Sequence, residues 1–213
     1  MSTKQEIKCP HCNKSIPIQE SIKHQAEELR KKLETEEKQK SAIRQKEIAI
    51  IITRFNDKQY EIYEPIENLH EDQILKHSKI PAEISDKILD QSKLWATQIA
   101  EELKYVGTLC VEFFIDRNEN LYVNEIAPRV HNSGHLTINT YNVSQFENHV
   151  RAVCQLEQIP LKKISNGRMI NIIGDQISVY RNKKLEKNEF FYDYLKKEIK
   201  SKRKMGHLTT LIS

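Results

Sequence analysis

The chain has 213 residues, of which 38% are hydrophobic and 30% charged, and its net charge is +4. This length allows one or two domains with a substantial core, and this balance is typical of a soluble protein. No apolar run approaches the roughly 20 residues of a membrane helix, and the first residues lack the apolar segment of a signal peptide. We therefore expect a cytoplasmic protein without a membrane partner, and the weak positive charge does not favour nucleic acid as a partner.

A single CxxC motif, Cys9-Pro10-His11-Cys12, lies near the start of the chain. Four cysteines in a reducing compartment indicate free thiols or a metal site rather than a disulfide framework. A structural Zn²⁺ site needs four ligands, and only His24 follows at a usable distance. Two alternatives stay open, a Zn²⁺ half-site completed by a second chain in a homodimer, or two unligated surface thiols.

Residues 18–44 carry a charged helical pattern. Its apolar positions alternate four and three residues apart, at Ile22, Ala26, Leu29 and Leu33. The stripe fades where Glu36 and Lys40 take the next seam positions, so we expect a short coiled coil or a solvated projecting helix. Residues 1–45 are predicted to form a first segment, with the CxxC knuckle and this charged helix.

A strand pair and an amphipathic helix are predicted next. Apolar strands at 47–55 and 59–63 flank the turn Asn56-Asp57-Lys58, which indicates a first hairpin. Between 84 and 105 the apolar spacing is helical, with Ser85 near the start and Gly107 past the end. Trp95 is assigned to the core-facing side of this helix rather than to ligand stacking.

A second hairpin is predicted from the strands TLCVEFFID and LYVNEIA, which Arg117-Asn118-Glu119-Asn120 connects. If Asn118 and Glu119 are its two turn residues, Glu112 and Glu125 face each other with Cβ atoms about 5 Å apart. Such a pair favours a shared proton or a hard cation such as Mg²⁺ between the carboxylates. The alternative is two solvent-facing glutamates, the commonest situation on strands.

The loop after this hairpin is dense in groups that bind anions or transfer protons. It follows a strand end, where functional sites tend to be built, and its polar residues are Arg129, His131, Asn132, Ser133 and His135.

The remaining elements are predicted from caps and apolar runs. Ser144 and Glu147 form a capping box that opens a helix to Cys154. Cys110 and Cys154 lie in apolar patterns and are expected to be buried thiols. RMINIIGD and ISVYR are predicted strands, and a final strand follows the basic stretch 196–204.

Several of these segments resemble a known family. VEFF, VNEIAPRVHNSGH, SQFENHVRAV, EIAIIITR, YEPIENLHEDQIL and RKMGHLT are similar to the C-terminal portion of 5-(carboxyamino)imidazole ribonucleotide synthase, an ATP-grasp enzyme of purine biosynthesis. The resemblance covers about residues 46–210. Residues 1–42 resemble instead the head of an uncharacterised bacterial family that couples a CPHC knuckle to a coiled coil.

The resemblance implies an α+β fold. Residues 46–158 would form a partial ATP-grasp domain with an antiparallel sheet and packed helices. Residues 159–213 would form a small β-rich domain. It also implies ATP- and bicarbonate-dependent carboxylation of 5-aminoimidazole ribonucleotide to its 5-carboxyamino form in IMP biosynthesis, by way of carboxyphosphate, with those three compounds as partners.

By resemblance, Glu112 and Glu125 would hold Mg²⁺, and Asn124 and Glu125 would contact ATP. Arg129, His131, Asn132 and His135 would line the catalytic pocket, with Arg129 on the bicarbonate-derived anion. A basic motif would contact the substrate phosphate through Lys197, Arg203 and Lys204.

The chain also departs from this family. Lys200 replaces an Arg, and Ser201-Lys202 replace a Pro-Gly turn. The family's N-terminal domain and glycine-rich lid have no counterpart here, since the five glycines are too widely spaced for a phosphate-cradling loop. The expected ligase is therefore incomplete in this chain. The alternative is a non-catalytic fusion remnant that acts as a coiled-coil or zinc-knuckle interaction protein.

Overall fold

The computed structural model describes residues 6–8, 11–12, 14–17, 25–32, 35 and 45–212, and the chain divides into two units, 1–44 and 45–213. In the first unit β1 (Glu6–Lys8) pairs antiparallel with β2 (Ser15–Pro17). Residues 25–32 are helical and exposed, which agrees with a solvated helix. Cys9, Ile22 and Leu33 of the predicted motif and stripe lie outside the described residues.

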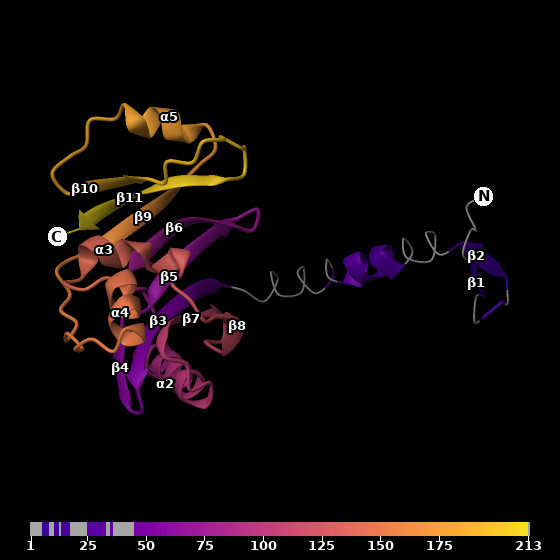
Figure 1. Ribbon diagram of the computed structural model, residues 1–213, viewed down its shortest axis with the longest axis horizontal. Coiled ribbons are helices and arrows are strands. Elements are labelled where there is room, and N and C mark those ends of the chain that lie inside the picture. The colour runs from indigo at the N-terminus through magenta and orange to yellow at the C-terminus, as the bar shows by residue number, and fades with distance from the viewer. Residues whose placement is uncertain are drawn as a thin grey trace. The chain divides into compact units, whose positions relative to one another are not determined.

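The second unit is built on one antiparallel sheet (Figure 1). Its strands within residues 45–212 are β3 (Lys46–Asn56), β4 (Gln59–Ile62), β5 (Ile66–Glu71), β6 (Ile74–Ile80), β7 (Gly107–Ile115), β8 (Leu121–Ala127), β9 (Asn166–Ile173), β10 (Glu189–Asp193) and β11 (Lys204–Ile212). The strand order is β10-β11-β9-β6-β5-β3-β7-β8, and β4 pairs with the far end of β3. The predicted α+β class with a large antiparallel sheet is confirmed. The sheet continues from β6 into β9, and the boundary at residue 158 stays a prediction.

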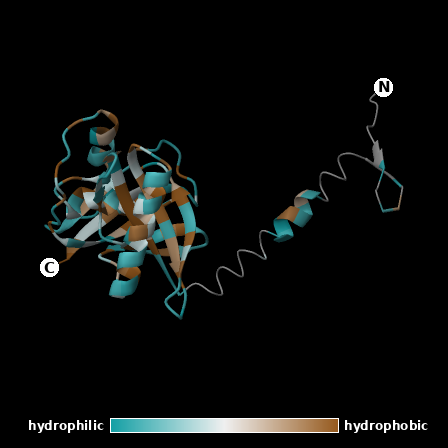
Figure 2. Ribbon diagram, turned by 90° about the horizontal axis from the view of Figure 1, so that it is seen from below, coloured by the Kyte–Doolittle hydropathy of each residue, from teal (hydrophilic) through white to brown (hydrophobic). Residues whose placement is uncertain are grey.

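One face of the sheet is covered by α2 (Asp86–Glu102), the predicted amphipathic helix. Its buried residues Ile88, Ala96 and Ala100 pack on alternate residues of β3 and β7, such as Ile50 and Val111. Trp95 packs against this core with its ring centroid 6.3 Å from that of Phe113, as predicted. Figure 2 shows this apolar interior as brown bands within the sheet.

The opposite face carries short helical segments, namely the 3₁₀ segment η1 (Asn132–Leu136), α3 (Thr137–Thr140) and α4 (Gln145–Val153). The Ser144 side chain caps α4 by accepting from the backbone N–H of Glu147 at 3.2 Å, as predicted. Side chains alternate across a strand, so Glu112 lies on this second face while its neighbours Val111 and Phe113 face α2.

The hairpin of β5 and β6 was not predicted, although it supplies part of the site described below. Its turn residues, Asp72 and Gln73, adopt left-handed φ angles of 49° and 63°. Such a turn normally carries Asn-Gly or Asp-Gly, and the sequence offers neither signal.

Two local predictions were wrong. ISVYR forms part of the helix α5 (Gln176–Arg181), because Ile177 and Tyr180, three residues apart, pack together on β9 and β11. Cys154 is exposed at the end of α4, where the apolar face of the helix has ended, whereas Cys110 is buried as expected.

The register of the second hairpin is right, but its turn is longer than predicted. Glu112 pairs with Glu125, whereas Ile115 pairs with Leu121 across a loop from Asp116 to Asn120. The Asp116 carboxylate organises this loop by accepting from the backbone N–H groups of Asn118 and Asn120. A bulge at Asn124 then shifts the pairing by one residue and brings the two glutamates opposite each other.

Candidate active site

Glu112 is the buried centre of the candidate site. It lies on β7 under η1 with 5% of its surface exposed. Burial is the main cause that raises its pKa to about 7, and the negative charge of Glu47 adds to the effect. The ligand atoms of Glu47, His70 and Glu112 lie within 4.8 Å of one another, so this group could hold a metal ion.

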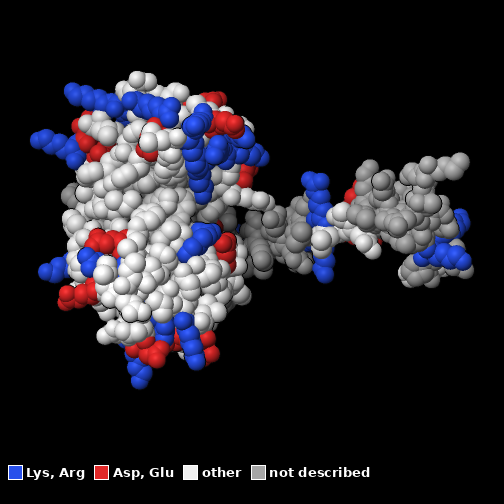
Figure 3. Space-filling model, viewed as in Figure 1, with Lys and Arg blue, Asp and Glu red and all other residues white. Residues whose placement is uncertain are grey.

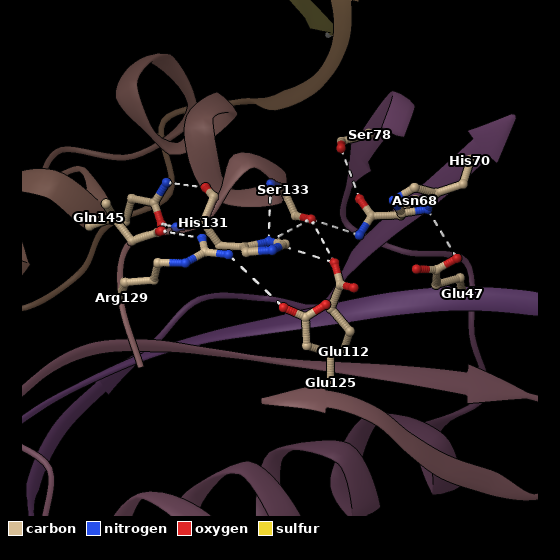
Figure 4. Close-up of polar contacts among 11 residues, drawn as sticks. Glu47, Asn68, His70, Ser78, Glu112, Glu125, Arg129, His131, Ser133 and Gln145 are labelled. Atoms are coloured by element: carbon tan, nitrogen blue, oxygen red, sulfur yellow. Dashed lines mark hydrogen bonds and ion pairs between the residues drawn. The ribbon is translucent and has the colours of Figure 1, made fainter. Parts of the chain in front are cut away.

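Glu125 has a different environment from Glu112. Its side chain is 52% exposed and lies 4.0 Å from the guanidinium of Arg129, which is also exposed. Figure 4 shows Glu125 beside Glu112 on the neighbouring strand. A second candidate metal group among the described residues consists of Cys110, Glu112 and His131, and neither group contains Glu125. The carboxylate that joins Glu112 in a candidate metal group is therefore that of Glu47, a residue that the sequence analysis did not identify.

A chain of hydrogen bonds through three uncharged side chains holds the Glu112 carboxylate in place (Figure 4). The Ser78 hydroxyl donates to the side-chain oxygen Oδ1 of Asn68 at 2.8 Å, and the side-chain nitrogen Nδ2 of Asn68 donates to the Ser133 hydroxyl at 2.8 Å. Ser133 in turn donates to Glu112 Oε1 at 3.3 Å. Because all four side chains are buried, the orientation of Glu112 depends on β5, β6 and η1 together.

His131 lies beside this carboxylate. Its Nδ1 is 3.6 Å from Glu112 Oε1 and 3.1 Å from the Ser133 hydroxyl. Burial is the main cause that lowers the pKa of His131 to about 4, and the charge of Arg129 contributes. The imidazole is therefore neutral at pH 7 and serves as a hydrogen-bonding group rather than as a cation. Gln145, fully buried, fixes the backbone of His131 by bonding both its N–H and its carbonyl, at 3.0 and 2.6 Å.

Gly134→Ala is expected to lower the free energy of unfolding by about 1–3 kcal/mol, as overpacking of a buried site does. A Cβ at this position would lie 2.6 Å from Oε1 of the buried Gln145 side chain. Urea unfolding measures the loss. In a Gln145→Ala background the same substitution should cost far less, and an equal cost in both backgrounds would contradict this steric explanation.

The other predicted residues of the loop, Asn132 and His135, lie in surroundings different from those of His131. Asn132 has both amide atoms buried and without a hydrogen-bond partner among the described residues. His135 turns toward the C-terminal strands, where its Nδ1 lies 2.9 Å from the Tyr194 hydroxyl. Neither residue has a contact with Glu112 comparable to that of His131.

The predicted basic motif is only partly at the site. Lys204, half-buried at the start of β11, is close enough for its charge to favour the ionised form of Glu112, and burial lowers its own pKa. Lys197 and Arg203 are exposed, and Arg203 donates to the carbonyl of Glu198 at 3.3 Å. Figure 3 shows Lys and Arg side chains gathered over the end of this unit that carries α5 and the loop before β11.

The predicted CxxC motif is described only in part. Cys12 is an exposed free thiol, and Cys9 lies outside the described residues. Among the helices that the structure describes, none is long and apolar enough to cross a membrane.

Sequence reasoning missed Glu47, Asn68, His70 and Gln145. Glu47 on β3 and Asn68 on β5 are cross-strand partners of each other. A buried glutamate at the start of the apolar strand EIAIIITR was the available signal, since an ionisable residue on a buried strand needs a partner.

Comparisons with known proteins agree with this architecture. The family model of the ATP-grasp domain matches residues 13–146, and that of the phosphoribosylaminoimidazole carboxylase C-terminal domain matches residues 168–213. The first match begins within the segment predicted to be an unrelated head.

Relatives of this chain from several organisms are named as N5-carboxyaminoimidazole ribonucleotide synthase or a variant of that name. N5-carboxyaminoimidazole ribonucleotide synthase of Bacillus subtilis is 40% identical over 164 residues, which are 76% of this chain and 43% of that protein. The Staphylococcus aureus N5-carboxyaminoimidazole synthetase complexed with ADP superposes with a TM-score of 0.75 at 36% identity, over 80% of this chain and 47% of that one. The Aspergillus clavatus synthase in complex with ADP and 5-aminoimidazole ribonucleotide gives a TM-score of 0.74 at 30% identity, over 80% and 48%.

The chain thus spans less than half the length of each of these three relatives. The ATP-grasp model nevertheless covers more than half of the chain, and the match includes both the Glu112 hairpin and the loop that follows it. The chain belongs to the ATP-grasp family.

Proposed function

We propose that this chain carries the metal and anion side of an N5-carboxyaminoimidazole ribonucleotide synthase site. The reaction is the ATP- and bicarbonate-dependent carboxylation of 5-aminoimidazole ribonucleotide in purine biosynthesis. The observation that carries the proposal is the buried Glu112 carboxylate, which has Glu47 and His70 within 4.8 Å and the cations Arg129 and Lys204 around it. The names of the relatives supply the substrate.

The donor set fits Mg²⁺. This ion prefers oxygen ligands and is usually held by one or two carboxylates together with substrate phosphates. In this proposal Glu112 and Glu125 hold the ion, with Asn124 next to them at the bulge. Two buried carboxylates as close as Glu112 and Glu47 repel each other, and a bound cation would relieve that repulsion. Once bound, Mg²⁺ would neutralise charge on the phosphates of ATP.

The cationic side chains suit the anions of this reaction. Arg129 is exposed and presents a planar fork that matches a carboxylate or phosphate. Lys204, on β11, is close enough to Glu112 for the two charges to interact. His131 is neutral and can donate or accept one hydrogen bond at the same anion. Lys197 and Arg203, on the exposed loop, would take the phosphate of the ribonucleotide.

The decisive experiment measures ADP formation that depends on both bicarbonate and 5-aminoimidazole ribonucleotide. It is run with the chain alone and with the separately expressed N-terminal part of the Bacillus subtilis relative added. Turnover that requires this chain and is lost in Glu112→Gln supports the proposal. Turnover no higher than background in both mixtures would refute it.

The first unit suggests an additional role as an interaction module, as for a fusion remnant. The support for this role is the antiparallel pairing of β1 with β2, which lie on either side of the CxxC motif in the sequence, and the exposed free thiol of Cys12. We also place the protein in the cytoplasm, because the described cysteines are free thiols.

The zinc half-site makes a separate prediction. The full chain, purified with Zn²⁺ present, should hold one zinc per two chains and sediment as a dimer. Cys12→Ser should lose both the metal and the dimer, while Cys154→Ser, a matched exposed thiol, should retain them. A monomeric wild-type chain without zinc would contradict the half-site.

A further inference from the structure

A buried and a partly buried histidine share a single tyrosine hydroxyl. Nδ1 of His135, on η1, and Nδ1 of His207, on β11, each lie 2.9 Å from the hydroxyl oxygen of Tyr194. The two imidazole centroids are 5.1 Å apart. The Tyr192 ring stacks on His207 at 4.6 Å, and the ammonium of Lys196 lies 5.4 Å from the Tyr194 ring centroid. Packing therefore holds this hydrogen-bonded triad from several sides.

The shared hydroxyl forces the two imidazoles into opposite tautomers. A tyrosine hydroxyl has one proton, so it donates to one histidine and accepts an N–H from the other. Both imidazoles are neutral, because burial lowers the pKa of His135 to about 3 and that of His207 to about 4. One histidine must then carry its proton on Nδ1 and the other on Nε2.

The surroundings of His207 select the direction. Its Nε2 is buried and has no hydrogen-bond partner among the described residues, as is also true of Asn171 Oδ1 and Thr209 Oγ1. Asn171 is the cross-strand partner of His207, and Thr209 lies two residues along β11, so all three share one face. The Asn171 amide nitrogen already donates to the carbonyl of Leu75, so its Oδ1 is an acceptor that has no partner among the described residues. An acceptor on this face favours a proton on His207 Nε2, through a buried water that joins the two groups.

We propose that Tyr194 and His207 are positioning residues that hold His135 in its Nδ1–H tautomer, with the Nε2 lone pair free to accept a proton. His207 carries its proton on Nε2, Tyr194 donates to His207 Nδ1, and His135 donates from Nδ1 to Tyr194. His135 is only partly buried, unlike His207 at 2% exposure, so it is the end of the triad that is open to solvent. Resting on the proposed function, this makes His135 the acceptor for the proton that the substrate amine loses when its nitrogen bonds to the carbon of carboxyphosphate, while the C–O bond to the phosphate breaks and phosphate leaves.

The test reads the tautomers directly by ¹⁵N NMR of the full chain labelled at histidine, at pH 7.5 and without nucleotide. We expect His135 as the Nδ1–H form and His207 as the Nε2–H form. In Tyr194→Phe, which keeps the ring, His135 should change to the Nε2–H form that an unconstrained imidazole favours. Tyr192→Phe is the matched control, because its hydroxyl bonds Asn139 outside the triad and its ring still stacks on His207.

The same tautomer on both histidines, or an unchanged His135 in Tyr194→Phe, would overturn the proposal. Because no substrate is present, this result is independent of whether the chain supports carboxylation. A failed activity assay with the expected tautomers would refute the proposed function and leave the positioning of His135 standing.

Discussion

Glu112→Gln is expected to raise the free energy of unfolding by about 2 kcal/mol at pH 8 in Mg²⁺-free buffer. The folded pKa of Glu112, about 7, lies above the ordinary value of 4.5. Ionised Glu112 therefore destabilises the folded state, and the cost grows as pH rises from about 4.5 to about 7, to roughly 3 kcal/mol. Glutamine does not ionise, and its side-chain oxygen can still accept the hydrogen bond from Ser133. Its side-chain NH₂ group needs a new hydrogen-bond partner, and this reduces the gain in the free energy of unfolding.

Urea unfolding at pH 5 and pH 8 in EDTA measures this effect, and the variant should gain little at pH 5. Added Mg²⁺ should stabilise the wild-type chain more than the variant, because only the wild type keeps the carboxylate. Glu125→Gln is the control, since its exposed side chain should change the metal-free stability by less than about 0.5 kcal/mol. A gain of equal size at both pH values would mean that the charge of Glu112 is not the cause.

Stability should fall steeply in mild acid, by several kcal/mol between pH 7 and pH 5. Burial is the main cause that lowers the folded pKa values of His131 and His207 to about 4 and that of His135 to about 3. A histidine with a depressed folded pKa stabilises the protein fully above its unfolded value of about 6.5, and this contribution is lost as pH falls toward the folded pKa. Each histidine can cost roughly 2 kcal/mol at pH 5. Three such groups outweigh the opposite dependence of Glu112.

Urea unfolding of the wild-type chain between pH 7 and pH 5 checks the sign and size of this loss. His207→Asn should reduce the pH dependence by more than a third, because one of the three histidines no longer titrates while the opposite dependence of Glu112 remains. Unfolding free energies that stay level over this range would show that burial does not hold the pKa values of these histidines below their unfolded value.

The sequence predicted the elements whose signals are local. The run EIAIIITR, the helical spacing that includes Ile88 and Trp95, and the cap at Ser144 each describe an element within one short window, and each formed as expected. The register of Glu112 against Glu125 was right although the turn was wrong, because the bulge at Asn124 compensates for the longer loop. A bulge leaves no pattern that period-two alternation can detect.

The partners of the site could not be predicted, because they depend on strands that pair far apart in sequence. Asn68 reaches Ser133 only because β5 lies beside β3, and Tyr194 reaches His135 only because the sheet continues to β10. The identity of the second buried carboxylate, Glu47, follows from the same pairing. Sequence alone therefore located the loop and the central glutamate, while the sheet topology determined which side chains surround them.

Binding of Mn²⁺, followed by electron paramagnetic resonance in the presence and absence of ADP, tests the cation site most directly. The wild-type chain should bind Mn²⁺ at a saturable site, and Glu112→Gln should weaken that binding at least about tenfold, as loss of a group that supports a metal does. Glu157→Gln, an exposed glutamate lining a groove remote from the site, should bind as the wild type does. Equal Mn²⁺ affinity in the wild type and Glu112→Gln would contradict the assignment of this cluster as the metal side of an ATP-grasp site.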